Sequence, residues 1–236
     1  MKYGKKQLQA GILSKIDNLK HGFGTRYSRP DRKSFPFAEH IIAMEQVHGC
    51  KIHDIKAEKN ETGNNRQITT AGQGDALVTG LKKLALAVKT ADCVPVLLYA
   101  DLPVISAVHC GWRSSAARIL SKTVTYLQKH YKIKPGKLRA ALGPAICGSC
   151  FTVGPEVIKA FPQKLIKKNV NYFKTDYNKY KLDLRAVLKQ ELAELGLSPS
   201  NIEIINRCTV CHNQLFFSYR LEKEKAGRQW SLIMLT

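Results

Sequence analysis

Apolar runs in the middle of the chain predict strands that are buried on both faces. Val94–Ala100 and 104–108 are apolar at nearly every position, and shorter apolar runs at 76–78 and 84–88 precede them. Strands covered by other layers on both faces give continuous apolar runs rather than alternating ones. The pattern predicts a buried sheet. Further strands are expected at 41–42 with Val47, 202–205, 215–219 and 230–235.

Helical periodicity replaces the strand pattern in three segments. Apolar residues recur at spacings of three and four over 114–131, and Pro135 and Gly136 follow as a stop signal. A second helix is predicted from Asp183, as N-cap, to Gly196, as C-cap. Residues 155–161 predict a short helix, and the Asn- and Gly-rich segment 58–74 predicts a surface loop between strands.

Strands and helices are mixed along a chain of 236 residues, without a repeat or a long linker. The expected class is α/β (α+β), in one domain covering 1–236. No apolar stretch reaches the roughly 20 residues of a membrane span, and the first 20 residues lack a signal-peptide core. We therefore expect a soluble protein.

The chain is strongly basic, with 38 Lys and Arg against 18 Asp and Glu. A formal charge of +20 favours an anionic partner: a nucleic acid, a membrane surface or a phosphate-bearing substrate. The lysines are spread along the chain, and no nucleic-acid-binding motif is present. A generally basic surface is the favoured interpretation over a dedicated nucleic-acid face.

Seven cysteines are an odd number for a disulfide framework in a chain of this length. They predict reduced thiols in a cytoplasmic protein, some of them ligands or nucleophiles. The pairs Cys147/Cys150 and Cys208/Cys211 have Cys-x-x-Cys spacing, but the gap between them far exceeds the ~15–20 residues of a compact zinc motif. Reduced cysteines are therefore favoured here over a second metal site.

Familiar nucleotide-enzyme motifs are absent from the sequence. It contains no phosphate-binding Gly-x-x-x-x-Gly-Lys loop, no Gly-x-Gly-x-x-Gly fingerprint, no Gly-x-Ser-x-Gly elbow and no His-Glu-x-x-His helix. None of the seven histidines is followed two residues later by Glu, as in zinc nucleobase deaminases.

Three metal-capable side chains stand where apolar strands give way to Gly, Pro or polar residues: His48, Cys93 and His109. Two imidazoles and one thiolate, with a fourth position left to water, form a catalytic type of zinc site. Such a metal lowers the pKa of bound water to about 7. The alternative is that each is an ordinary side chain, a hydrogen-bonded His or a small hydrophobic Cys.

Six ordered blocks resemble the YfiH-type laccase-domain family, also known as multicopper polyphenol oxidase-like proteins. They are Gln-Val-His-Gly at 46–49, Gly-Asp-Ala-Leu-Val-Thr at 74–79, 90–98, Val-His-Cys-Gly-Trp-Arg at 108–113, Leu-Gly-Pro-Ala-Ile at 142–146 and Phe-Ser-Tyr-Arg at 217–220. The resemblance implies a layered α/β/β/α arrangement of mixed sheets. It also implies phosphorolysis of adenosine, inosine, guanosine and methylthioadenosine, and hydrolytic deamination of adenosine.

The resemblance places the family's zinc on His48, Cys93 and His109. The chain departs from the family at Cys110, a second thiol beside the expected metal, and in a shorter stretch over 37–46. The role of Cys110 stays open, whereas the shorter stretch concerns the pocket rim and the substrate preference more than the chemistry.

Deamination needs an acid near the metal, and phosphorolysis needs a cation that holds the phosphate. Asp92 is the first candidate to protonate the departing ammonia, and Asp75 the second; either could instead orient a ligand. Arg113 and Arg220 are expected to bind phosphate, with Arg26 third, because a guanidinium grips phosphate through two hydrogen bonds. The open alternative for each Arg is a surface ion pair. Trp112 is either a core aromatic or a stacking face for a purine.

The expected substrates are therefore purine nucleosides and phosphate, with Zn²⁺ as cofactor and a monomer or homodimer as the assembly. Three other functions stay open: a copper-dependent polyphenol oxidase, a peptidoglycan-precursor amide hydrolase, and a non-enzymatic nucleic-acid binder. Copper is disfavoured because laccase chemistry needs several coppers, and three methionines offer few axial ligands.

Overall fold

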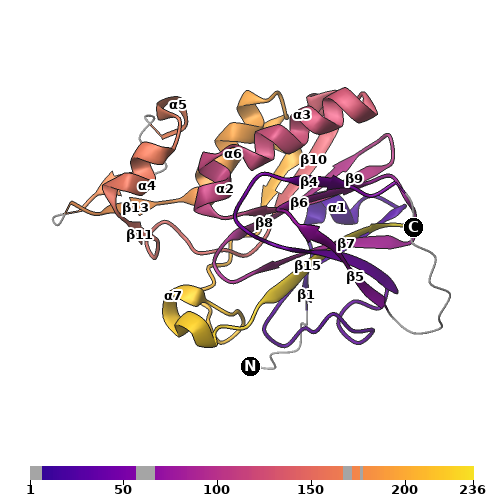
Figure 1. Cartoon of the computed structure of the whole chain (residues 1–236), viewed down its shortest axis with the longest axis horizontal. Helices are drawn as coiled ribbons and strands as arrows, with labels where there is room; N and C mark the ends of the chain where they lie inside the picture. The colour runs from indigo at the N-terminus through magenta and orange to yellow at the C-terminus, as the bar shows by residue number, and fades with distance from the viewer. Residues whose placement is uncertain (1–6, 57–66, 167–171, 176–177) are drawn as a thin grey trace.

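The computed structural model describes residues 7–56, 67–166, 172–175 and 178–236. Two six-stranded sheets stack face to face, and helices cover the outer face of one of them (Figure 1). Both sheets mix parallel and antiparallel neighbours. The predicted α/β class with layered mixed sheets is confirmed.

The first sheet has the order β1-β2-β15-β7-β3-β5. Its strands are β1 (Gln7–Leu8), β2 (Leu19–Gly24), β15 (Gln229–Leu235), β7 (Leu84–Thr90), β3 (His40–Glu45) and β5 (Gln67–Gln73). The second sheet has the order β14-β10-β8-β9-β6-β4. Its strands are β14 (Ile202–Ile204), β10 (Leu138–Leu142), β8 (Val94–Ala100), β9 (Val104–Cys110), β6 (Ala76–Thr79) and β4 (Ile52–Asp54).

A small third sheet, β11-β13-β12, and several helices complete the described part of the chain. The strands are β11 (Thr152–Val153), β13 (Tyr180–Leu182) and β12 (Tyr172–Lys174). The helices are α1 (Gly11–Ser14), α2 (Trp112–Ala116), α3 (Ile119–Tyr131), α4 (Pro155–Ala160), α5 (Gln163–Ile166), α6 (Leu184–Glu194) and α7 (Tyr219–Glu222). Short 3₁₀ turns lie at Pro135–Lys137, Pro199–Asn201 and Lys223–Lys225.

The alternation of side chains in β8 and β9 explains why these strands are apolar throughout. In β9, Val104, Val108 and Cys110 belong to the core that also contains residues of α3 and α6, whereas Ile105 and Ala107 pack between the two sheets. Successive side chains point to opposite faces of a sheet, so a strand between two apolar layers needs apolar residues at every position. These strands form the buried centre of the fold.

The outer face of the first sheet is covered by the segment 25–39, a run of turns without a helix in this fully described stretch. Phe35 and Ala38 from this segment pack on Ile41, Ala85 and Leu232 of the sheet. A loop thus takes the place of an outer helical layer at this position.

Most predicted elements are found, with four corrections. Residues 215–219 form no strand. The backbone of Phe217 pairs with the side-chain amide of Gln229 instead of a neighbouring strand, through hydrogen bonds of 2.9 and 3.3 Å. Helix α7 begins at Tyr219. Val47 lies outside β3. Within the predicted loop 58–74, residues 67–73 are strand β5, and 58–66 lie outside the described residues.

The fourth correction concerns the helix predicted over 114–131, which is two helices. Arg118 between them has a left-handed backbone, with φ of 66°. Its side chain pairs with Glu191 of α6 at 3.0 Å, an attachment that periodicity does not reveal. The helix at 183–196 starts as predicted, because the Asp183 carboxylate accepts hydrogen bonds from two backbone N–H groups. Gly196 follows its end with φ of 95°.

Across the described ranges, none of the helices combines the length and apolar character needed to cross a bilayer.

Candidate functional site

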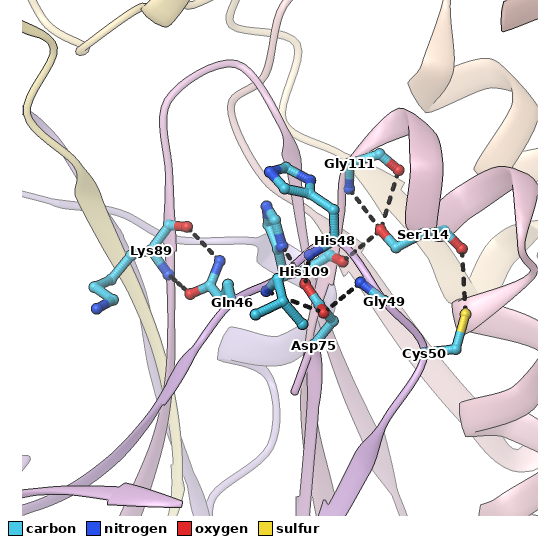
Figure 2. Close-up of polar contacts among 10 residues, drawn as sticks. Gln46, His48, Gly49, Cys50, Asp75, Lys89, His109, Gly111 and Ser114 are labelled. Carbon is cyan, nitrogen blue, oxygen red and sulfur yellow. Dashed lines mark hydrogen bonds and ion pairs between the residues drawn. The ribbon is translucent and has the colours of Figure 1, made fainter. Parts of the chain in front are cut away.

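The candidate site lies where three strands end: β3 runs into residues 46–49, β7 into 91–93, and β9 into Gly111 and Trp112. Gln46 fixes the first of these ends. Its side-chain amide donates to the carbonyl oxygen of Lys89 at 2.7 Å and accepts from the Lys89 N–H at 2.8 Å (Figure 2). A side chain thus continues the β3–β7 pairing after β3 has ended.

Asp75 anchors the loop that carries His48. This fully buried carboxylate accepts backbone N–H groups from His48 at 3.1 Å and Gly49 at 2.7 Å. The loop can wrap the carboxylate because His48 has a left-handed backbone, with φ of 58°. Successive N–H groups in such a turn form a concave anion-binding nest, and here the anion belongs to the protein itself.

Asp75 also orients His109. The Nδ1–H of His109 donates to the Asp75 carboxylate at 2.7 Å, so Nε2 is the ring nitrogen that lies away from Asp75 (Figure 2). Burial alone would lower the pKa of His109, but electrostatic and hydrogen-bond interactions with Cys93 and Asp75 outweigh it and raise that pKa to about 9. Burial would raise the pKa of Asp75, but the bonds from His109 and Gly49 hold it below its ordinary value. Asp75 is therefore a carboxylate rather than an acid at neutral pH.

The structure brings His48, Cys93 and His109 together from three separate strand ends. One ligand atom from each lies within 4.8 Å of the other two. The two imidazole rings lie side by side, with centroids 4.8 Å apart (Figure 2). Burial and the neighbouring His109 lower the pKa of His48, which favours its neutral, metal-binding form.

Gly111 has no side chain, and the side chains of His48 and Cys93 occupy the space where one would lie. A Cβ at this position would lie 2.4 Å from Nδ1 of His48 and 3.3 Å from Sγ of Cys93. Two nitrogens and one sulfur at this spacing, with one imidazole oriented by a buried carboxylate, match the donors of an open zinc-type site. The residues present therefore fit a metal ion.

Cys110 points away from this group. It is fully buried in the core that faces the helices, in phase with Val108, whereas His109 takes the opposite face of β9. Burial raises the pKa of the Cys110 thiol well above its ordinary value. It therefore behaves as a small apolar side chain and not as a second thiolate beside the metal-capable group.

A pocket of about 540 Å³ opens over the three metal-capable residues, a volume typical of small-ligand sites. Among the described residues, its walls carry five cationic side chains and one carboxylate, Asp92. The cations are Lys89, Arg113, Arg220, Lys223 and Arg228. Three aromatic side chains share the walls: Trp112, Phe151 and Tyr219. The pocket therefore favours an anionic ligand with a flat apolar part.

The structure places Asp92, Arg113 and Arg220 in this pocket and Arg26 elsewhere. The Asp92 carboxylate accepts from Oγ1 of Thr209 at 2.6 Å and from the N–H of Arg220 at 2.7 Å. Cζ of Arg113 lies 4.4 Å from the centroid of the Trp112 ring. Arg26 lines a separate hollow, where it pairs with Glu222.

Three pocket cations escaped the sequence reasoning: Lys89, Lys223 and Arg228. Lys89 is the one charged residue in the otherwise apolar β7, which is a signal that could have been used: a cation in a buried strand needs a reason. Arg228 comes directly before β15 and carries no comparable local signal. Only the pairing of β15 with β7 brings it to the pocket.

Comparison with known proteins agrees with this geometry. The family model described as multi-copper polyphenol oxidoreductase laccase matches residues 29–236. The chain belongs to this laccase-domain family. The family resemblance predicted from the six sequence blocks is thereby confirmed.

Similar members of the family have names drawn from nucleoside chemistry. The purine nucleoside phosphorylase YlmD of Geobacillus stearothermophilus is 34% identical over 204 residues, which cover 85% of this chain and 73% of that protein. An adenosine deaminase, RL5, from an unknown prokaryotic organism is 31% identical over 81% of this chain and 73% of its own length. The family to which the chain belongs thus includes enzymes of the purine nucleoside class.

Solved structures in the laccase-domain family have the same fold. The crystal structure of YlmD from Geobacillus stearothermophilus superposes with a TM-score of 0.85 at 28% identity, covering 100% of this chain and 98% of that one. The Bacillus licheniformis hypothetical protein YfiH gives 0.82 at 25% identity, covering 99% and 98%. The two-sheet arrangement is therefore a property of the family and not of this chain alone.

Proposed function

We propose that this protein is a zinc-dependent purine nucleoside enzyme that phosphorolyses adenosine, inosine, guanosine and methylthioadenosine and hydrolytically deaminates adenosine. The observation that carries the proposal is the composition of one pocket. Its walls hold a three-donor metal-capable group, an excess of cations and three aromatic faces. Metal, phosphate and purine each find a matching surface there.

Phosphate binding is assigned to the arginines. Arg113 and Arg220 line the pocket. A planar guanidinium binds a phosphate through two parallel hydrogen bonds, which also sets the direction of attack on C1′ of the ribose. Arg220 is well held for this role, because its Nη1 donates to the carbonyl oxygen of Thr152 at 3.0 Å and its N–H donates to Asp92.

Purine binding is assigned to the aromatic side chains and Ile146 of the same pocket. Trp112 is half-buried and follows the metal-capable strand end directly. We assign the purine to this wall of the pocket, beside the metal-capable group. Trp112 also packs against the buried core, and Arg113 lies over its ring, so its assignment as a stacking face rests on its place in the pocket lining.

His48, Cys93 and His109 would hold the zinc ion. When bound, zinc supplies Lewis-acid chemistry, polarising a water molecule or a substrate atom. Asp75 holds one proton of His109 on Nδ1, so Nε2 is the nitrogen that would bind zinc, after releasing its own proton. Asp75 is buried, whereas Asp92 reaches the pocket, so we assign to the Asp92 carboxylate the transfer of a proton from the attacking water to the departing ammonia.

Two further points belong to the same proposal. The seven cysteines are all free thiols, which supports a reducing compartment such as the cytoplasm. The names of the similar phosphorylase and deaminase support both reactions on one scaffold.

The test is incubation of the purified protein with adenosine, with and without inorganic phosphate. We expect adenine and ribose 1-phosphate when phosphate is present, and inosine when it is left out. Removal of the metal by a chelator is expected to stop both reactions, and added zinc to restore them. Formation of neither product by zinc-loaded protein would reject the proposal.

A further inference from the structure

A second group of metal-capable side chains lies outside the pocket lining. It consists of four cysteines: Cys147 and Cys150 in the loop after β10, and Cys208 and Cys211 in the loop after β14. All four sulfur atoms lie within 4.8 Å of one another. The structure therefore brings together two Cys-x-x-Cys pairs that the sequence spacing kept apart.

Parallel pairing explains how distant segments meet. Strands β10 and β14 are parallel neighbours, with Leu142 opposite Ile204, so both chains leave the sheet at the same edge. The pairing continues into the loops. Ala145 donates to the carbonyl oxygen of Arg207 at 3.2 Å and accepts from the N–H of Thr209 at 3.2 Å. The two Cys-x-x-Cys pairs need no compact local motif to meet, because the sheet brings their loops together.

The surroundings suit thiolates. The buried sulfur of Cys208 accepts backbone N–H groups from Cys147 at 3.3 Å and Cys211 at 3.4 Å. Lys181 adds a cation, since its Nζ donates to the carbonyl oxygen of Ser149 inside the first pair at 2.7 Å. N–H donors and a nearby cation stabilise the negative charge that a metal-bound thiolate carries.

We propose that Cys147, Cys150, Cys208 and Cys211 bind one Zn²⁺ as a closed, structural tetrathiolate site. In a tetrahedral site with Zn–S bonds of about 2.3 Å the sulfurs are about 3.8 Å apart, so binding needs a contraction of at most about 1 Å. Two-residue spacing within each pair is the usual spacing of structural zinc ligands. The adjacent His212 is not among the side chains whose ligand atoms converge here, and its Nδ1 donates to the carbonyl oxygen of Cys208 at 3.1 Å.

The zinc would tie together two loops that support the catalytic pocket. The first loop contains Ile146, whose N–H donates to the backbone of Asp92 at 3.0 Å. The second contains Thr209, whose hydroxyl bonds the Asp92 carboxylate. The zinc would thus hold one wall of the pocket in place and would take no part in the nucleoside reactions.

A disulfide is the competing use of these thiols. The sulfurs of Cys150 and Cys211 are 3.5 Å apart, a distance that a small movement would convert into a bond. Zinc is favoured because a disulfide engages two cysteines and leaves Cys147 and Cys208 unexplained, whereas zinc engages all four.

The test counts zinc in protein purified under reductant, using elemental analysis and native mass spectrometry. Cys93→Ala removes a pocket ligand and isolates the cluster, and this variant is expected to retain about one zinc per chain. Adding Cys150→Ser or Cys211→Ser to it should remove that zinc. Adding Cys50→Ser, which changes a half-buried thiol outside both groups, should not.

A measurement on the unaltered chain covers the case in which a cluster variant fails to fold. Cys211 is the exposed member of the group. With zinc bound, its alkylation by iodoacetamide should be roughly tenfold slower than after chelation, because the sulfur lone pair is engaged; Cys50 should react equally in both states. A folded Cys93→Ala protein without zinc, equal alkylation of Cys211 in both states, or a Cys150–Cys211 disulfide in freshly purified protein would overturn the proposal.

Discussion

The two cysteine-containing groups of this protein differ in how their donors are arranged and in what lies beside them. The pocket group has two imidazoles and one thiol, from three strand ends, and a cavity of about 540 Å³ opens over it. The four-thiol cluster fills a whole coordination shell with protein atoms, and Cys208 in it is buried. Three donors beside a cavity leave a position for a reacting molecule, whereas four donors leave none.

Charge separates the two regions as clearly as donor number does. Cations crowd the pocket, where a phosphate is expected, whereas the cluster contains four groups that become anionic on binding a metal. The two proposals thus give the free cysteines of one chain different roles: one thiol would take part in the chemistry, and four would hold two loops together.

The largest expected effect is loss of turnover on removing the pocket thiol. Cys93→Ala should lower kcat/KM for adenosine by about 10³-fold or more, because two imidazoles alone hold zinc weakly and the Lewis acid is lost. Cys211→Ser is the matched change in the cluster, and it should leave kcat/KM within about tenfold of the unaltered protein. Equal losses in the two variants would abolish the distinction between the sites.

Asp75→Asn should have an intermediate effect that is confined to the pocket. The amide cannot hold the His109 tautomer as the carboxylate does, so zinc affinity at the pocket should fall by about 10–100-fold. Competition with a chelator measures this affinity. Asp101→Asn is the control, because Asp101 is exposed and pairs with Arg139 at 3.4 Å. A matching loss of zinc from the four-thiol cluster would show that Asp75 acts on the fold as a whole.

Arg113→Gln should have the smallest and most selective effect. The KM for phosphate should rise by about 10–100-fold, since a charged hydrogen bond contributes about 1.5–3 kcal/mol. Deamination of adenosine without phosphate should change by no more than about twofold. Steady-state kinetics of both reactions in one preparation makes the comparison. A parallel decline of both would place Arg113 in the folding of the pocket and not in phosphate binding.

The sequence predicted the pocket better than the cluster, for a physical reason. His48, Cys93 and His109 each stand at the end of a strand, and strand ends are local features that a pattern can locate. Cys147 and Cys208 meet because β10 and β14 are parallel neighbours, and strand order is a long-range property that local patterns do not encode. The two Cys-x-x-Cys pairs looked unconnected in the sequence because they are far apart along the chain.

The same limit explains the errors in the fold. The run 215–219 has the apolar character of a strand, but its partner is the side chain of Gln229, which no periodicity reveals. Strand β5 was missed because its residues alternate between exposed and half-buried and are mostly polar. The continuous apolar strands β8 and β9 were found because burial on both faces leaves an unmistakable pattern.

The most direct test of the division between an open and a closed site uses Co²⁺ in place of zinc in both groups. Adenosine and phosphate are then added while the visible spectrum is recorded. Cobalt d–d bands respond to a change of ligand or geometry at the metal. In Cys93→Ala protein, which keeps only the cluster, the bands should stay unchanged on addition, whereas the unaltered protein should show a saturable shift. A shift in the Cys93→Ala protein, or none in the unaltered protein, would contradict the account.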